Sequence, residues 1–139
     1  QTIPLTGAVV VTTPQEVALI DVRKAVKMFE TLKVPVLGIV ETMSYFVCDG
    51  CDKKHFIFSG GGGEKLAQEY GLPLLGQIPI DPKVCEDSDN GVAIVDDDAA
   101  RPGSPQAYKD AAGSLAVQVS LLHETKNEAL KSFSLIWKN

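Results

Sequence analysis

Short apolar runs alternate with helix-like patterns along most of the chain. Runs at residues 5–12, 36–40 and 74–80 are nearly continuous and rich in branched apolar side chains, as is typical of strands buried on both faces of a sheet. Between them, apolar residues recur every three or four positions at residues 14–33 and 64–70, which predicts two amphipathic helices. This alternation predicts an α/β fold, with a parallel sheet flanked by helices and joined by right-handed crossovers.

Special residues mark the ends of the predicted helices. Thr13 is expected to cap the first helix, with Pro14 at its first position and Glu16 reaching back to complete a capping box. Gly71 stands in the usual glycine position after the second helix. Asp81, followed by proline, predicts a third, short helix by the same cap-plus-proline logic.

The last third of the chain follows a different pattern. Residues 96–104 are polar and contain proline and glycine, which predicts a solvated linker after a first domain at residues 1–95. An apolar stripe at helical spacing then predicts a long helix. Phe133, Leu135 and Trp137 alternate as in a strand. We therefore expect residues 105–139 to hold a C-terminal helix and a short strand-like segment.

The composition places the chain among globular domains and excludes two classes of partner. Its 139 residues are 45% hydrophobic and 22% charged, which suits one compact core. A net charge of −5 offers no basic surface to nucleic acid, and no apolar run is long enough to cross a bilayer, so neither is expected as a partner. Without a signal peptide, a soluble cytoplasmic protein is expected. Because the first residue is Gln and a strand pattern follows at once, we expect a piece of a longer protein.

Three cysteines carry the strongest candidate chemistry. An odd number without an export signal argues against a disulfide framework. Cys48 and Cys51 are separated by Asp and Gly, whose tight turn aims both sulfurs the same way and lets them hold one metal ion or the edge of a cluster. Three interpretations stay open: a zinc site completed by His55, a redox-active dithiol, and a cluster shared with a second copy of the chain. Cys85 is expected to be a buried, unreactive thiol.

A glycine-rich stretch at residues 59–65 (SGGGGEK) opens the second predicted helix. Bare amides at a helix start can bind an anion, but this stretch lacks the Gly-Lys-Ser/Thr of a Walker A loop. We expect a flexible helix entry here rather than a phosphate site. No Walker A loop occurs elsewhere in the chain.

Four consecutive segments resemble the Mrp/ApbC family of P-loop ATPases, which is similar to MinD and ParA. They are residues 7–21 (GAVVVTTPQEVALID), 35–51 (PVLGIVETMSYFVCDGC), 58–67 (FSGGGGEKLA) and 74–82 (LLGQIPIDP), and the resemblance covers residues 3–95. In that family the Walker A and Walker B motifs lie upstream. The resemblance therefore implies the C-terminal half of a P-loop NTPase (Rossmann-like) fold, without ATPase activity in isolation.

The resemblance also implies an iron–sulfur cluster carrier. Family members hold a [4Fe-4S] cluster between two subunits through this Cys-x-x-Cys, so Cys48 and Cys51 would be its ligands in a homodimer. The full protein would bind ATP and Mg²⁺, receive the cluster from a scaffold and pass it to apo-protein acceptors. An open sheet edge, left by the upstream strands, also predicts an oligomer. The alternatives from other classes are a non-enzymatic zinc module held by Cys48, Cys51 and His55, and a MinD-like positioning ATPase.

Nucleotide-binding positions are implied by the same resemblance. Thr42 stands where relatives have Asn, whose amide reads the adenine edge, so adenine selectivity is expected to be weaker here. The candidate contacts lie at the carboxyl ends of the three strands, where open α/β sheets place ligands, and they are Thr13, Gln15, Thr42, Pro79, Ile80 and Asp81. A simpler interpretation is that Thr13 and Asp81 cap helices and that Pro79 forms a turn.

Overall fold

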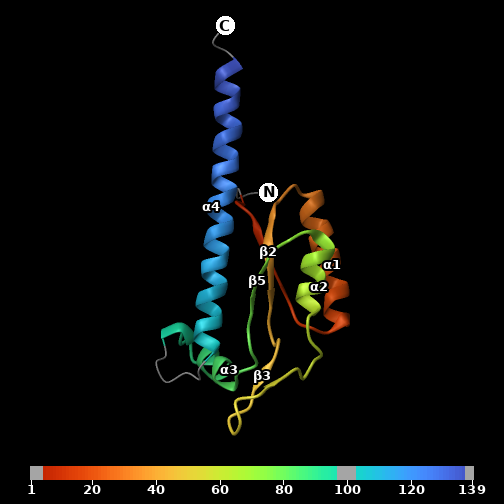
Figure 1. Cartoon of the computed structure of the whole chain (residues 1–139), viewed down its shortest axis with the longest axis vertical. Helices are drawn as coiled ribbons and strands as arrows, with labels where there is room; N and C mark the ends of the chain where they lie inside the picture. The colour runs from red at the N-terminus through yellow and green to blue at the C-terminus, as the bar shows by residue number, and fades with distance from the viewer. Residues whose placement is uncertain (1–4, 97–102, 137–139) are drawn as a thin grey trace.

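A three-stranded parallel sheet forms the centre of the molecule. The computed structural model describes residues 5–96 and 103–136 of the chain. The sheet runs in the order β1 (Ala8–Thr12), β2 (Val36–Glu41), β5 (Leu74–Gln77), as Figure 1 shows. Two of these strands are shorter than the apolar runs that predicted them. The predicted parallel sheet with helical crossovers is confirmed.

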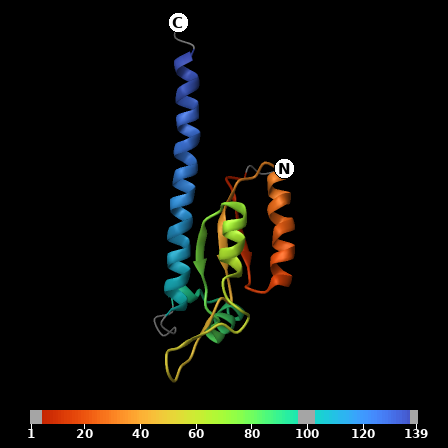
Figure 2. The same cartoon turned by 45° about the vertical axis from the view of Figure 1, so that its right-hand side comes forward.

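Helices cover both faces of this sheet. α1 (Glu16–Thr31) and α2 (Gly62–Tyr70) lie on one side, and α4 (Ser104–Ile136) packs against β2 and β5 on the other (Figures 1 and 2). α3 (Pro82–Asp89) and a 3-10 turn (Ile94–Asp96) lie near the start of α4, whose far end extends well past the sheet. Within the described residues, no helix combines the length and the apolar character that a membrane span requires.

The hydrophobic core lies between the sheet and the helices α1 and α2. A single cluster of buried apolar side chains fills it: Val10, Leu19, Val26, Ile39, Leu66 and Ala67. Ile39 and Leu66 are completely buried, so truncation of either to alanine is expected to cost about 2–5 kcal/mol of stability. The apolar periodicity of α1 and α2 thus faces the sheet, as predicted.

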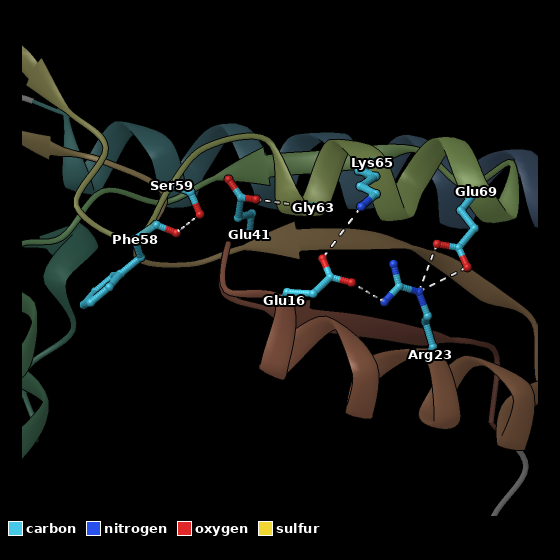
Figure 3. Close-up of polar contacts among 8 residues, drawn as sticks. All are labelled: Glu16, Arg23, Glu41, Phe58, Ser59, Gly63, Lys65 and Glu69. Atoms are coloured by element: carbon cyan, nitrogen blue, oxygen red, sulfur yellow. Dashed lines mark hydrogen bonds and ion pairs between the residues drawn. The ribbon is translucent and has the colours of Figure 1, made fainter.

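A network of surface charges joins α1 to α2 (Figure 3). Arg23 Nη1 lies 3.0 Å from the Glu16 carboxylate, and Arg23 Nε lies 3.0 Å from Glu69. Lys65 Nζ lies 3.7 Å from Glu16 on its other side. The carboxylates and Lys65 are exposed, so water screens these ion pairs and each contributes little to stability. The network therefore links the surfaces of α1 and α2 and adds little to the stability of the fold.

The start of α1 differs from the prediction. The helix begins at Glu16, and its N-cap is Gln15, which makes no side-chain capping hydrogen bond. Thr13 Oγ1 instead donates to Gln15 Oε1 at 2.6 Å, and the Glu16 carboxylate is used by the surface charges, so the predicted capping box is wrong. α3 follows its prediction, because Asp81 Oδ1 accepts the Lys83 N–H at 2.9 Å and proline occupies the first turn.

Two further elements differ from prediction. β5 ends at Gln77 rather than at residue 80, since Pro79 has no N–H to give to the ladder. Phe133 and Leu135 belong to α4, so the predicted terminal strand is wrong: a helix satisfies its own backbone groups there, whereas a lone strand would leave them unpaired. Trp137 and residues 97–102 of the predicted linker lie outside the described residues, and Ser104 is the first residue of α4.

Candidate metal centre

Cys48 and Cys51 are free thiols between β3 (Phe46–Val47) and β4 (Lys54–His55). These two short strands run antiparallel and form a hairpin beyond the carboxyl ends of the sheet strands (Figure 1). The Cys48 N–H donates to the Lys53 carbonyl at 3.0 Å, and the Asp52 N–H donates to the Cys48 carbonyl at 2.9 Å. Asp52 has a φ of 55°, in the left-handed region that Asp adopts more readily than most residues. These backbone hydrogen bonds close the loop.

The hairpin register brings Cys48 and His55 together. His55 pairs with Phe46, and Cys48 stands two residues after Phe46, so both side chains belong to one face of the hairpin as diagonal neighbours. Cys51 lies in the turn between them. The Sγ atoms of the two cysteines and a ring nitrogen of His55 all lie within 4.8 Å of one another. Cys48 is half-buried, while Cys51 and His55 are exposed.

Backbone amides prepare the Cys48 sulfur to lose its proton. The amide of Gly50 hydrogen-bonds to this sulfur and is the main cause of a lowered Cys48 pKa, and the thiol and amide of Cys51 lower it further. Hydrogen bonds to the charged form favour that form, and the thiolate is the form that binds metal. The turn of the Cys-x-x-Cys thus favours the thiolate form of Cys48, which is the form that binds metal.

The donor set suits a soft metal ion or an iron–sulfur cluster. Two thiolates and one imidazole are ligands of zinc and iron rather than of magnesium or calcium. A four-cysteine cluster needs two more thiolates than this hairpin offers, and a tetrahedral ion needs one more ligand than the three present. Among the described residues, this is the one group of three such side chains close enough to share a metal.

A pocket of about 340 Å³ lies beside the base of the hairpin. Four of the predicted nucleotide contacts line it: Thr42, Pro79, Ile80 and Asp81. Thr13 and Gln15 do not line this pocket and hydrogen-bond to each other at the end of β1. The structure thus brings together the positions after β2 and β5 and leaves those after β1 apart.

Two side chains of this pocket, Asp81 and Cys85, bear on what it could bind. Asp81 is buried and caps α3 with Oδ1, while its Oδ2 has no hydrogen-bond partner within the described residues. Cys85 also lines the pocket and is exposed, so the prediction of a buried cysteine is wrong. The reason is that Cys85 lies on α3, a short helix whose burial is confined mainly to Asp87.

Glu41 was missed by the sequence analysis and is the most connected polar side chain near the site. It ends β2 and is completely buried. Its Oε1 accepts from Ser44 Oγ at 2.5 Å and from Gln77 Nε2 at 3.2 Å. Its Oε2 accepts from the Gly63 N–H, as Figure 3 shows. The sequence did contain a signal, because Glu41 is a charged residue at the end of an otherwise apolar strand. Glu41 therefore joins the ends of β2 and β5 to the start of α2.

The glycines at the start of α2 allow this close packing. A Cβ on Gly62 would lie 2.6 Å from the Pro14 carbonyl oxygen, and one on Gly63 would lie 2.9 Å from Glu41 Cβ. Gly61 precedes them with a φ of 78°, which favours glycine. Since the Gly63 amide is used by Glu41, this helix start binds an internal carboxylate, and the glycines are needed for contact between elements.

Comparison with protein families gives a match over most of the chain. Residues 1–116 match the family model described as "ParA: NUBPL iron-transfer P-loop NTPase". The "iron-sulfur cluster carrier protein" of Aquifex aeolicus is 56% identical over 95 residues, covering 68% of this chain and 26% of the relative. The "iron-sulfur cluster transfer protein NUBPL" of Dictyostelium discoideum is 41% identical over 138 residues, covering 98% and 42%. The chain therefore spans less than half the length of these relatives.

Solved structures give the same picture of the fold. A nucleotide-binding protein of Archaeoglobus fulgidus, in complex with ADP and with cobalt found in it, is 43% identical, with a TM-score of 0.55 over 62% of this chain and 35% of that one. The cell division ATPase MinD of Pyrococcus furiosus has a TM-score of 0.59 at 22% identity, covering 80% of this chain and 42% of its own. At 22% identity, the similarity to MinD concerns the fold alone. Both solved structures support the prediction that this chain forms half of a P-loop NTPase fold.

Proposed function

This chain belongs to the family of NUBPL-type iron-transfer P-loop NTPases, and we propose that it carries the cluster ligands of an iron–sulfur cluster carrier. Cys48 and Cys51 would hold a [4Fe-4S] cluster that is the protein's cargo, received from a scaffold and passed to apo-protein acceptors. The observation that carries this proposal is the placement of both sulfurs, half-buried and exposed, on a hairpin outside the core. A cluster there is within reach of another protein.

Ligand counting supports a shared site. A [4Fe-4S] cluster takes four thiolates, and this hairpin offers two. Two copies facing each other across a two-fold axis would supply all four. A cluster held between subunits is released when they separate, which suits transfer better than electron transport. The thiols would need a reducing compartment such as the cytoplasm.

We further propose that the complete protein binds ATP and Mg²⁺ next to this hairpin. The upstream half would supply the phosphate site, while Thr42, Pro79, Ile80 and Asp81 would contact the base, with Thr13 and Gln15 at the next strand end. The Ile80 N–H donates to the Tyr45 carbonyl at 2.7 Å, three residues before Cys48. Because one segment lines the pocket and also pairs with the root of the hairpin, a bound nucleotide could shift the cluster ligands.

A structural zinc staple fits the molecule less well. Zinc staples support small folds that lack a sufficient core. Here the hairpin is closed by backbone hydrogen bonds, and the buried cluster of apolar residues lies between the sheet and α1 and α2. A metal at Cys48 and Cys51 is therefore not needed to hold the fold.

Anaerobic reconstitution with iron and sulfide tests the cluster proposal. The chain is expected to gain the absorbance of a cluster together with the molecular mass of a dimer. Cys48→Ser and Cys51→Ser should each abolish both changes, because either substitution removes two of the four ligands. Cys85→Ser is the matched control and should leave both unchanged, since Cys85 lies on α3. A stable cluster on a monomer, or one that survives the loss of Cys48, would refute the proposal.

A further inference from the structure

His55 is left unused by a four-cysteine cluster, although the fold places it against both sulfurs. Its ring lies on the same hairpin face as Cys48, within 4.8 Å of the thiols of Cys48 and Cys51. Its position follows from the β3–β4 register rather than from a chance meeting of loops. An imidazole nitrogen beside the two thiols gives one chain three ligands, so the site does not need a second copy.

We propose that a single chain binds one divalent transition-metal ion of the Fe²⁺, Co²⁺ or Zn²⁺ class through Cys48, Cys51 and His55. The fourth position of the ion stays open to water or to an incoming ligand. This site goes beyond cluster carrying, because it needs neither sulfide nor a dimer. It describes the protein in its cluster-free, monomeric state.

The geometry needs only small side-chain movements. In a tetrahedral site with metal–sulfur bonds of about 2.3 Å and metal–nitrogen bonds of about 2.0 Å, neighbouring donor atoms stand about 3.5–3.8 Å apart. The three donors already lie within 4.8 Å of one another. Cys51 and His55 are exposed, so rotamer changes can close the remaining gap of about 1 Å without disturbing a packed core.

The chemistry of the donors sets the class of ion. Thiolate and imidazole ligands favour Zn²⁺, Co²⁺ and Fe²⁺, while Mg²⁺ and Ca²⁺ take oxygen ligands. Two thiolates also neutralise the charge of a divalent ion, so a neutral imidazole is a suitable third ligand. With three protein ligands and one open position, the site resembles exchangeable metal centres more than closed structural ones.

The two metal states make opposite demands on His55. A mononuclear ion on one chain uses its imidazole, whereas a cluster between two chains is held by four cysteines. His55→Ala should therefore weaken the first state and spare the second. The two proposals therefore fail separately. If His55→Ala leaves the affinity for a single ion unchanged, this inference is wrong, whereas a cluster that survives Cys48→Ser contradicts the cluster proposal.

The test is an anaerobic titration of the reduced, cluster-free chain with Co²⁺, whose visible absorption reports tetrahedral geometry and thiolate ligation. Native mass spectrometry gives the number of ions per chain. We expect one ion on a monomer. His55→Ala should raise the Kd by about tenfold or more, since the loss of even an outer-shell partner of a metal ligand costs about 10–100-fold.

The chain contains a matched control. His123 is its second histidine and lies exposed on α4, so His123→Ala should leave Co²⁺ affinity unchanged. His55→Gln tests whether the imidazole itself is needed, and circular dichroism checks that each variant is folded. One ion per two chains with no effect of His55→Ala, or no binding of Co²⁺ by the folded wild-type chain, would overturn the inference.

Discussion

Replacement of Glu41 tests whether a buried carboxylate holds the strand ends and the start of α2 together. Its two oxygens accept hydrogen bonds from Ser44 Oγ, Gln77 Nε2 and the Gly63 N–H. Ser44 is completely buried and Gly63 is buried, so neither donor could turn to water if the carboxylate were lost. Glu41→Ala would leave both of these donors unsatisfied.

The magnitude follows from these contacts. A buried donor left without its partner costs about 1–3 kcal/mol, and Glu41→Ala leaves two, together with a cavity where the side chain packed. We expect Glu41→Ala to lose about 3–5 kcal/mol. Glu41→Gln keeps the shape, and its amide oxygen can still accept from the Gly63 N–H. Its NH2 group then faces Ser44 and Gln77, whose hydroxyl and amide must turn to accept. The variant should lose about 1–2 kcal/mol, from these rearranged hydrogen bonds and the lost attraction between the charge and the positive end of α2.

Guanidinium unfolding followed by far-ultraviolet circular dichroism measures both changes as shifts in midpoint and free energy. Glu30→Gln is the control, because Glu30 is exposed on α1 and a surface substitution is expected to change stability by less than about 0.5 kcal/mol. If Glu41→Ala were as stable as Glu30→Gln, or no less stable than Glu41→Gln, the anchoring role assigned to Glu41 would be wrong.

Three further predictions follow from the site. Gly62→Ala should lose about 1–3 kcal/mol in the same unfolding assay, because its Cβ would lie 2.6 Å from the Pro14 carbonyl oxygen, whereas Gly113→Ala, with open space in α4, should gain about 0.5–1 kcal/mol. In the reduced, metal-free chain, the lowered Cys48 pKa means more thiolate at neutral pH, so the midpoint of its alkylation rate against pH should lie below the value of about 8.5 for a free cysteine; an equal midpoint would contradict the hydrogen-bond argument. In the complete protein, Thr42→Asn should increase the preference for adenine over guanine by about 1–3 kcal/mol in competition binding, and no change would remove Thr42 from the base pocket.

The fold class could be predicted from the sequence because its signals are local. The strands, the amphipathic helices and the αL glycine after α2 each depend on a few neighbouring residues, and the structure confirms them. The expected burial on both faces is wrong for β1, because Val11 is 57% exposed. Gly71 has a φ of 62°, as its position predicted. Local patterns were less reliable at boundaries, where Thr13 and Gln15 bond to each other and the capping box does not form.

The tertiary structure decided what local patterns do not contain. The apolar and polar pattern of residues 42–55 does not predict which residues pair across the hairpin. Only that pairing places His55 on the same face of the hairpin as Cys48. Likewise, the partners of Glu41 come from three separate elements, so no short window of sequence holds them together. By itself the sequence determined the fold class, the family and the Cys-x-x-Cys. The convergence of side chains depends on contacts between distant segments, and packing alone fixes those.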